Sequence, residues 1–111
     1  MRTYAGTRGA NRQHTVTVTE GGIRTLLPAR RDLADHSQTG FGWGRSGQGP
    51  AQLALALLAD AVGWVDAVEM HYAFYEEVVM RLPESWILTS NEIMAWYCKK
   101  TTRIPECNAA G

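Results

Sequence analysis

The stretch that decides the fold is residues 50–62, which read PAQLALALLADAV. Alanine and leucine dominate it, and both have a strong intrinsic preference for the α-helix. Pro50 suits the first helical turn, where the N–H that proline lacks would have no partner, and Gly63 suits the position that ends a helix. Because apolar residues fall on nearly every side, we expect this helix to be central and the most buried element.

The residues before this helix carry the pattern of a β-hairpin. Residues 15–19 alternate threonine and valine, which is the period of a half-buried strand. Residues 20–22 read Glu-Gly-Gly, a turn in which the glycines tolerate positive φ, and residues 23–27 supply the return strand. We expect a third strand over residues 3–5, since an isolated hairpin is only marginally stable in water.

Two further helices are expected after the central one. Residues 65–82 carry apolar side chains at spacings of three and four, and Pro83 ends that helix. Residues 86–88 are short and extended, as in an added edge strand. Residues 89–92 form a capping box, so the third helix begins at Ser90.

These elements predict an α+β fold, with a small antiparallel N-terminal sheet of two to four strands packed on three helices. The length of 111 residues fits one domain. We expect that domain to span residues 1–100, followed by a flexible C-terminal tail over residues 101–111.

Charge is distributed unevenly along a chain whose net charge is zero. Residues 1–49 carry seven arginines against three acids, whereas residues 50–97 carry seven acids against Arg81. Such polarity fits either a partner surface or an ordinary solvated one. No apolar run approaches the ~20 residues of a membrane helix, and no apolar leader opens the chain, so a cytoplasmic location is expected.

Cysteine and histidine usage gives no sign of a metal or cofactor site. Cys98 and Cys107 are expected to be free thiols, because nothing in the sequence indicates an oxidising compartment. The histidines at positions 14, 36 and 71 are scattered rather than spaced as metal ligands. We therefore predict no metal and no cofactor.

The segment with most chemical potential is residues 40–49, in which five of ten residues are glycine. One interpretation is a phosphate or nucleotide site at the N-terminus of the following helix, where free N–H groups attract anions. The other is structural: the glycines let the loop turn while its aromatic side chains pack on the central helix. The loop is not a Walker A motif, and residues 42–47 fit G-x-G-x-x-G without a preceding strand. The candidate binding residues are Phe41, Trp43, Arg45, Ser46, Gln48 and Gln52.

His36 and Ser37 lie just before this loop and complete the set of ligand- or partner-binding candidates. A His-Ser-Asp triad with Asp35 is not favoured, because triads are recognised by geometry rather than adjacency, and no G-x-S-x-G elbow is present. A hydrogen bond that orders the loop is the simpler role. We expect no enzymatic activity and no catalytic residues.

The segment over residues 35–60 resembles a family of small uncharacterised domains of bacteria, phages and plasmids. That family carries a His-Ser-Pro-x-Gly-Phe-x-Trp-Gly segment followed by Gly-Pro-Ala-Gln-Leu-Ala-Leu-Ala-Leu-Leu. The similarity extends over about residues 2–97, including the Val-Val-x-Arg-Leu-Pro segment at residues 78–83. This chain departs from the pattern at Gln38 and Arg45, where the family usually has proline and tyrosine.

The resemblance assigns no activity, but it implies a mobile-element habitat, in which small inhibitors of host defence are common. Our leading hypothesis is a non-enzymatic interaction protein that binds a host or phage protein, and its finer version is an anti-CRISPR-type inhibitor of a bacterial defence system. The alternative is a small nucleotide- or phosphate-binding module that uses residues 40–49 and the following helix N-terminus. Nucleic acid is not favoured, because the later helices are acidic and the pI is near 6.8.

Overall fold

The computed structural model describes residues 1–9, 14–38 and 40–101. Its elements run in the order β1 (Thr3–Arg8), β2 (His14–Glu20), β3 (Ile23–Leu26), α1 (Gln48–Ala61), α2 (Trp64–Glu77), the 3₁₀ helix η1 (Val79–Arg81), β4 (Trp86–Thr89) and α3 (Ser90–Thr101). The predicted α+β fold is confirmed, with a four-stranded antiparallel sheet and three α-helices.

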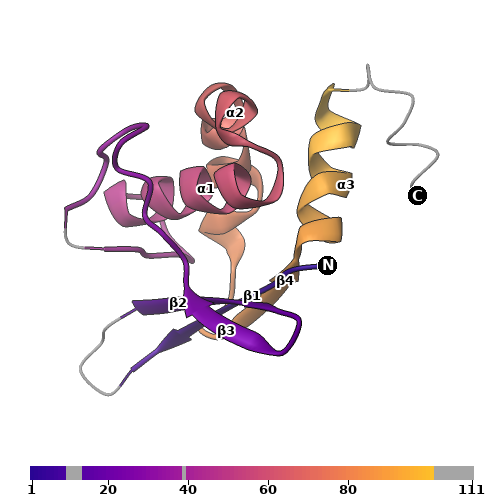
Figure 1. Cartoon of the computed structure of the whole chain (residues 1–111). Coiled ribbons are helices and arrows are strands. Elements are labelled where there is room, and N and C mark those ends of the chain that lie inside the picture. Colours follow the sequence, from indigo (N-terminus) through magenta and orange to yellow (C-terminus); the bar gives the residue numbers. More distant parts are fainter. Residues whose placement is uncertain (10–13, 39, 102–111) are drawn as a thin grey trace.

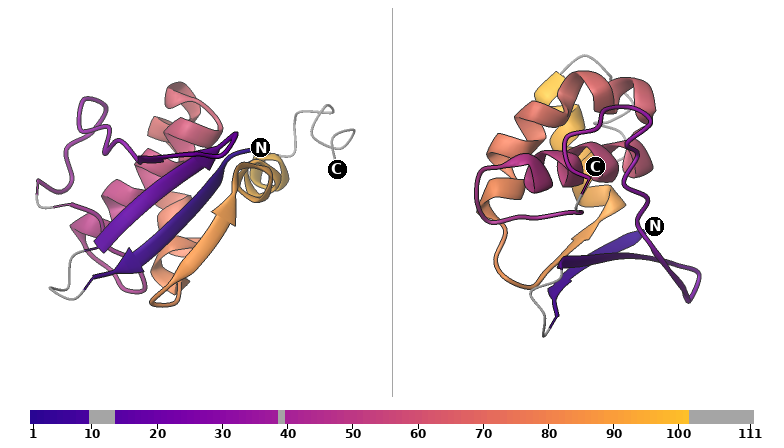
Figure 2. Two further views of the ribbon diagram at one scale, coloured as in Figure 1. Left: turned by 60° about the horizontal axis from the view of Figure 1, so that its bottom comes forward. Right: turned by 90° about the vertical axis from the view of Figure 1, so that its left-hand side faces the viewer.

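The four strands lie in the order β3-β2-β1-β4, so the last strand joins the sheet at the free edge of the first. Tyr4 sits opposite both Val18 and Leu88 in this register. The close approach of Trp86 requires Gly6, because a Cβ on that glycine would lie 2.3 Å from the indole ring. All three helices lie on one face of the sheet, and no described element covers the other face (Figures 1 and 2).

Helix α1 is the centre of the molecule, as residues 50–62 predict. Ten consecutive residues, Pro50 to Ala59, are buried. The helix begins two residues earlier than the position expected from Pro50, at Gln48. Asp60 ties it to the sheet, because its carboxylate accepts a hydrogen bond from the Tyr4 hydroxyl at 2.7 Å and from Arg2 at 2.6 Å.

The C-terminal elements match the sequence predictions at the start of α3 but not at the end of α2. The capping box at the start of α3 is confirmed, with the Glu92 amide donating to Thr89 Oγ1 at 3.1 Å and the Thr89 amide donating to Glu92 Oε1 at 2.9 Å. The helix expected over residues 65–82 instead ends at Glu77 and continues as η1. Among the described residues, no helix combines the length and the apolar character required to cross a membrane.

One expectation about the cysteines is wrong. Cys98 forms a disulfide in the structure rather than carrying a free thiol. The other cysteine, Cys107, and almost all of the predicted tail over residues 101–111 lie outside the described residues. Since the tail was judged on composition alone, its flexibility stays a prediction.

Candidate functional site

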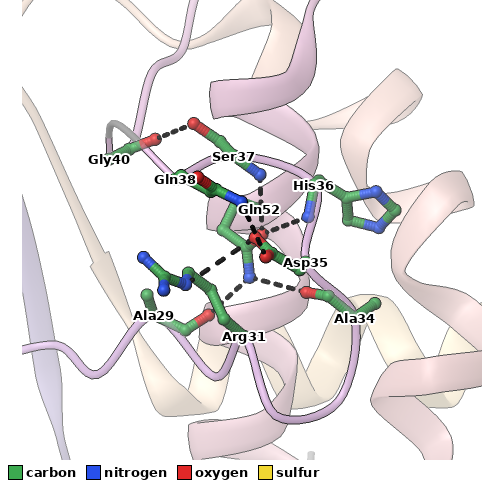
Figure 3. A network of polar contacts seen from close by, with 9 residues as sticks. All are labelled: Ala29, Arg31, Ala34, Asp35, His36, Ser37, Gln38, Gly40 and Gln52. Carbon is green, nitrogen blue, oxygen red and sulfur yellow. Dashed lines mark hydrogen bonds and ion pairs between the residues drawn. The ribbon is translucent and has the colours of Figure 1, made fainter.

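The buried side-chain amide of Gln52 on α1 binds the backbone of the segment over residues 29–38 at four points. Its Oε1 atom accepts hydrogen bonds from the backbone amides of His36 at 2.7 Å and Ser37 at 3.1 Å. Its Nε2 atom donates to the carbonyls of Ala29 at 2.7 Å and Ala34 at 3.0 Å (Figure 3). Gln52 is completely buried, so these four bonds satisfy an amide that would otherwise be costly to remove from water.

The same loop places His36 directly on His71 of α2. Their Nε2 atoms lie 2.9 Å apart. His71 Nδ1 lies 2.9 Å from the Ala67 carbonyl oxygen and 3.1 Å from that of Val68. Because carbonyls only accept, His71 Nδ1 carries a hydrogen, and in the tautomer that leaves His71 Nε2 as an acceptor, the His36 Nε2–H donates to it.

Burial, followed by the charge of His71, lowers the pKa of His36, while Asp35 opposes that shift. Burial therefore favours the uncharged form of His36, because a charged imidazolium is costly to remove from water. In the part of the chain that the structure describes, no three His, Cys, Asp or Glu side chains gather as metal ligands. The contact joins the loop to α2 as a hydrogen bond.

The glycine-rich loop before α1 is packed shut by its own aromatic residues. Trp43 is 2% exposed and donates from Nε1 to the Glu84 carbonyl at 3.1 Å. Phe41 is half-buried against the same core. Gly49 lies so close to the loop backbone that a Cβ there would meet the Gly42 nitrogen at 3.0 Å. Both rings belong to the packing of the core, Trp43 within it and Phe41 against it, which is the structural role that the second interpretation gives to the loop.

The polar candidates of this loop lie on the surface and do not converge. Arg45, Ser46 and Gln48 are exposed, and Arg45 contacts only the neighbouring Ser46 carbonyl among its described hydrogen bonds. The Gly47 amide, which points from the N-cap of α1, donates to the Tyr75 hydroxyl at 2.9 Å. The structure thus separates the eight sequence candidates: Gln52, His36 and Ser37 meet in one network, Phe41 and Trp43 pack in the core, and the other three face solvent.

A surface that sequence reasoning missed lies on α2, beside the histidine pair. Four large apolar side chains of this helix face solvent: Trp64 (57% exposed), Val65 (55%), Val68 (42%) and Tyr72 (54%). At 100° per residue they fall within a stripe about 100° wide, adjacent to the buried stripe that includes Ala67, His71 and Phe74. We call these four residues the α2 apolar face.

The α2 apolar face is fixed on one side and charged on the other. The Tyr72 ring lies 4.3 Å from the His71 ring and 5.4 Å from the His36 ring, measured between centroids. Asp66, Glu69 and Glu76 follow the α2 apolar face around the helix, so its far flank is acidic. An apolar centre with rigid aromatic groups and a charged rim is the anatomy of a protein-binding surface.

One sequence signal could have found this surface. Helix α2 has more apolar positions than one buried stripe needs, because residues 64, 65, 68 and 72 are apolar in addition to residues 67 and 74, which lie beside His71 on the buried side. A helix packed on one side requires only a single stripe. The second stripe therefore had to be either a further packing surface or an exposed face.

Comparison with known proteins gives a family without a function. A family model described as a family of unknown function (DUF6166) matches residues 4–99. No curated protein and no solved structure matches the chain. The expected membership of an uncharacterised domain family is supported, whereas the phage and plasmid distribution of that family is not addressed by the match.

Proposed function

We propose that this chain, which belongs to the DUF6166 family of unknown function, is a non-enzymatic protein-binding module that uses the α2 apolar face. The observation that carries the proposal is the exposure of Trp64 and Tyr72, each more than half open to solvent, on one helix face. Tryptophan and tyrosine are the residue types most enriched at binding hot spots, and contiguous exposed apolar patches on single chains commonly mark interfaces.

The shape and charge of the face define its partner. Trp64, Val68 and Tyr72 are spaced four residues apart on one helix, the pattern of a helix that lies in an apolar groove. The acidic flank formed by Asp66 and Glu69 calls for lysine or arginine along one side of that groove. The proposed partner is therefore a protein with an apolar groove bordered on one side by basic residues.

The histidine pair supports binding through pre-organisation. Tyr72 rests against both histidine rings, and His36 is held in place by the Gln52 network. A side chain that is already ordered loses less conformational entropy when a partner covers it. The Gln52 network would therefore aid binding indirectly, by ordering Tyr72, although it does not itself touch the partner.

A photo-crosslinking capture experiment tests the proposal. A photoreactive phenylalanine analogue at position 72 should crosslink a protein from a bacterial lysate, and the crosslinked partner segment should contain lysine or arginine near apolar residues. The variant Val68→Asp should abolish capture, because it places a charge in the middle of the face. The matched control is Ile87→Asp, which changes a side chain 68% exposed on the open face of the sheet.

Capture that is lost with Val68→Asp and retained with Ile87→Asp supports the proposal. Equal capture by both variants and the wild type contradicts it, as does a crosslinked segment without basic residues. Circular dichroism should show that both variants keep the helical content of the wild type, since each altered side chain lies on the surface.

The finer version of the proposal, in which the partner is a bacterial defence complex, rests on the family resemblance alone. A plaque assay in a strain that carries an active CRISPR system tests it. Expression of the wild type should raise phage plating, and Val68→Asp should not. Unchanged plating with the wild type would remove this version and leave the binding module itself to the crosslinking test.

A further inference from the structure

A groove is lined by residues of the β2–β3 hairpin, by Arg2 just before β1, by Pro28 and by Asp60 near the end of α1. Its volume is about 500 Å³. Its lining includes the apolar side chains of Val18, Ile23 and Pro28 and the charged side chains of Arg2, Glu20 and Asp60. A smaller cavity of about 130 Å³ shares Pro28 and Asp60 and extends the groove toward Ala56 and Ala59.

Strand β3 forms the rim of this groove and is an open sheet edge. All four of its residues are exposed, and within the described residues its one sheet neighbour is β2. The Leu27 amide donates to the Val16 carbonyl, and Thr25 sits opposite Val18. Hydrogen-bonded positions alternate along an antiparallel pair, so Ile23 and Thr25 direct their backbone groups toward β2, whereas Arg24 and Leu26 direct theirs outward.

We propose that an extended segment of a partner protein adds to the β3 edge as a fifth strand and inserts alternate side chains into the groove. The outward N–H and C=O groups of Arg24 and Leu26 supply the backbone pairing. Every second residue of the added strand then faces the helix side of the sheet, where the groove lies. Strand addition needs an unpaired sheet edge for the backbone and pockets for alternate side chains, and both lie together at β3.

Charge on the two faces of β3 defines the sequence of the added strand. On the groove side, Arg2 bridges Asp60 at 2.6 Å and Glu20 at 3.2 Å, so two carboxylates face one guanidinium. A lysine or arginine of the added strand balances this excess of negative charge. On the open face, Arg24 pairs best with a glutamate or aspartate. The segment therefore alternates apolar or basic residues with acidic ones.

A second copy of this chain fits the edge less well. Antiparallel self-pairing through β3 would bring both Arg24 side chains onto the same face of the joined sheet, where like charges repel. A heterologous segment satisfies both faces.

Two peptides test the inference: Thr-Val-Glu-Lys-Glu-Val-Thr and its charge-reversed counterpart Thr-Val-Lys-Glu-Lys-Val-Thr. The first should bind with at least about tenfold higher affinity by NMR titration, a factor equal to about 1.4 kcal/mol. Its binding should slow hydrogen exchange at the Arg24 and Leu26 amides. The Ile23 and Thr25 amides, already paired with β2, should change little.

Arg24→Pro should abolish binding, because it removes an outward N–H while sparing the ladder to β2. Arg24→Lys, which keeps both the amide and the charge, should bind like the wild type. Backbone N-methylation of the peptide blocks the same pairing from the other partner, which keeps the test open if Arg24→Pro does not fold.

Three results would overturn the inference: equal affinity for the two peptides, binding without protection at Arg24 and Leu26, or no binding at millimolar peptide. Protection of these amides that rises with protein concentration alone would identify a second copy as the occupant instead. Loss of capture by Val68→Asp does not bear on this edge, so the two proposals fail independently.

Discussion

The glycine-rich loop and the α2 apolar face differ in a way that composition does not suggest: the tryptophan of the unusual segment is buried and that of the ordinary one is exposed. The loop has the most unusual composition in the chain, yet its tryptophan, Trp43, is 2% exposed. Helix α2 has an ordinary composition, yet its tryptophan, Trp64, is 57% exposed. The unusual glycine content of the loop therefore serves packing, whereas the large apolar side chains that face solvent belong to a helix of common residue types.

The largest expected difference in stability comes from replacing one tryptophan in each region by alanine. Trp43→Ala should lower the free energy of unfolding by about 3–5 kcal/mol, because it empties a core site and strands the Glu84 carbonyl. Trp64→Ala should change it by less than about 0.5 kcal/mol. Urea denaturation of both variants measures the contrast. Similar losses in the two variants would mean that the α2 apolar face packs within the fold.

A second contrast compares two glutamines of α1, of which Gln52 is buried and Gln48 is exposed. Gln52→Leu should cost about 2–3 kcal/mol, since it leaves buried backbone groups of the loop without partners. Gln48→Leu changes an exposed side chain and should cost no more than about 0.5 kcal/mol. Hydrogen exchange should also accelerate at His36 and Ser37 in the first variant only. Unchanged exchange there would show that Gln52 does not hold the loop.

The sequence predicts the features that depend on contacts between residues close together in the chain. The hairpin, the buried helix α1 and the capping box at Thr89 are written within a few neighbouring residues, and the structure confirms each. The Gln52 network and the His36–His71 contact join residues 15 to 35 positions apart. No local pattern fixes such contacts, which is why these residues could be chosen as candidates but not placed together.

The exposed face of α2 was missed for a different reason. Its spacing identifies apolar stripes, but spacing alone does not tell which stripe the core covers. That depends on how α1 and the loop over residues 29–40 are oriented against α2, and this orientation is set by tertiary packing. The sequence therefore established the helix and left its free side undetermined.

The His36–His71 pair should make the stability of the fold beside the α2 apolar face depend on pH. Because the folded-state pKa of His36 is lowered, the unfolded chain binds the proton more readily. The stabilisation is therefore complete above the unfolded value of about 6.5 and is lost as pH falls through the folded pKa. The groups that face the ring are His71 and Tyr72 of α2, with Asp35 beside it in the loop.

Urea titrations at pH 7.5 and 5.5 check this expectation against a variant. The wild type should be less stable at the lower pH, and His36→Gln should show a smaller dependence. Partner capture through Tyr72 should weaken over the same range if the pair orders that ring. A pH dependence unchanged in His36→Gln would assign the titration to another group.

The smallest expected effect belongs to Arg45→Glu, which asks whether the exposed part of the glycine-rich loop has any role beyond packing. Arg45 is exposed and makes its described hydrogen bond to the adjacent Ser46 carbonyl, so reversing its charge should alter stability by less than about 0.5 kcal/mol.

A phosphate- or nucleotide-binding loop would behave differently. Ligand would raise the melting temperature of the wild type, and the variant would lose that rise, because binding to the folded state alone stabilises it. A thermal-shift screen against phosphate and nucleotides separates the two cases: no shift in either protein leaves the loop a packing element and the contrast with α2 intact, whereas a shift confined to the wild type would make the loop a second functional surface.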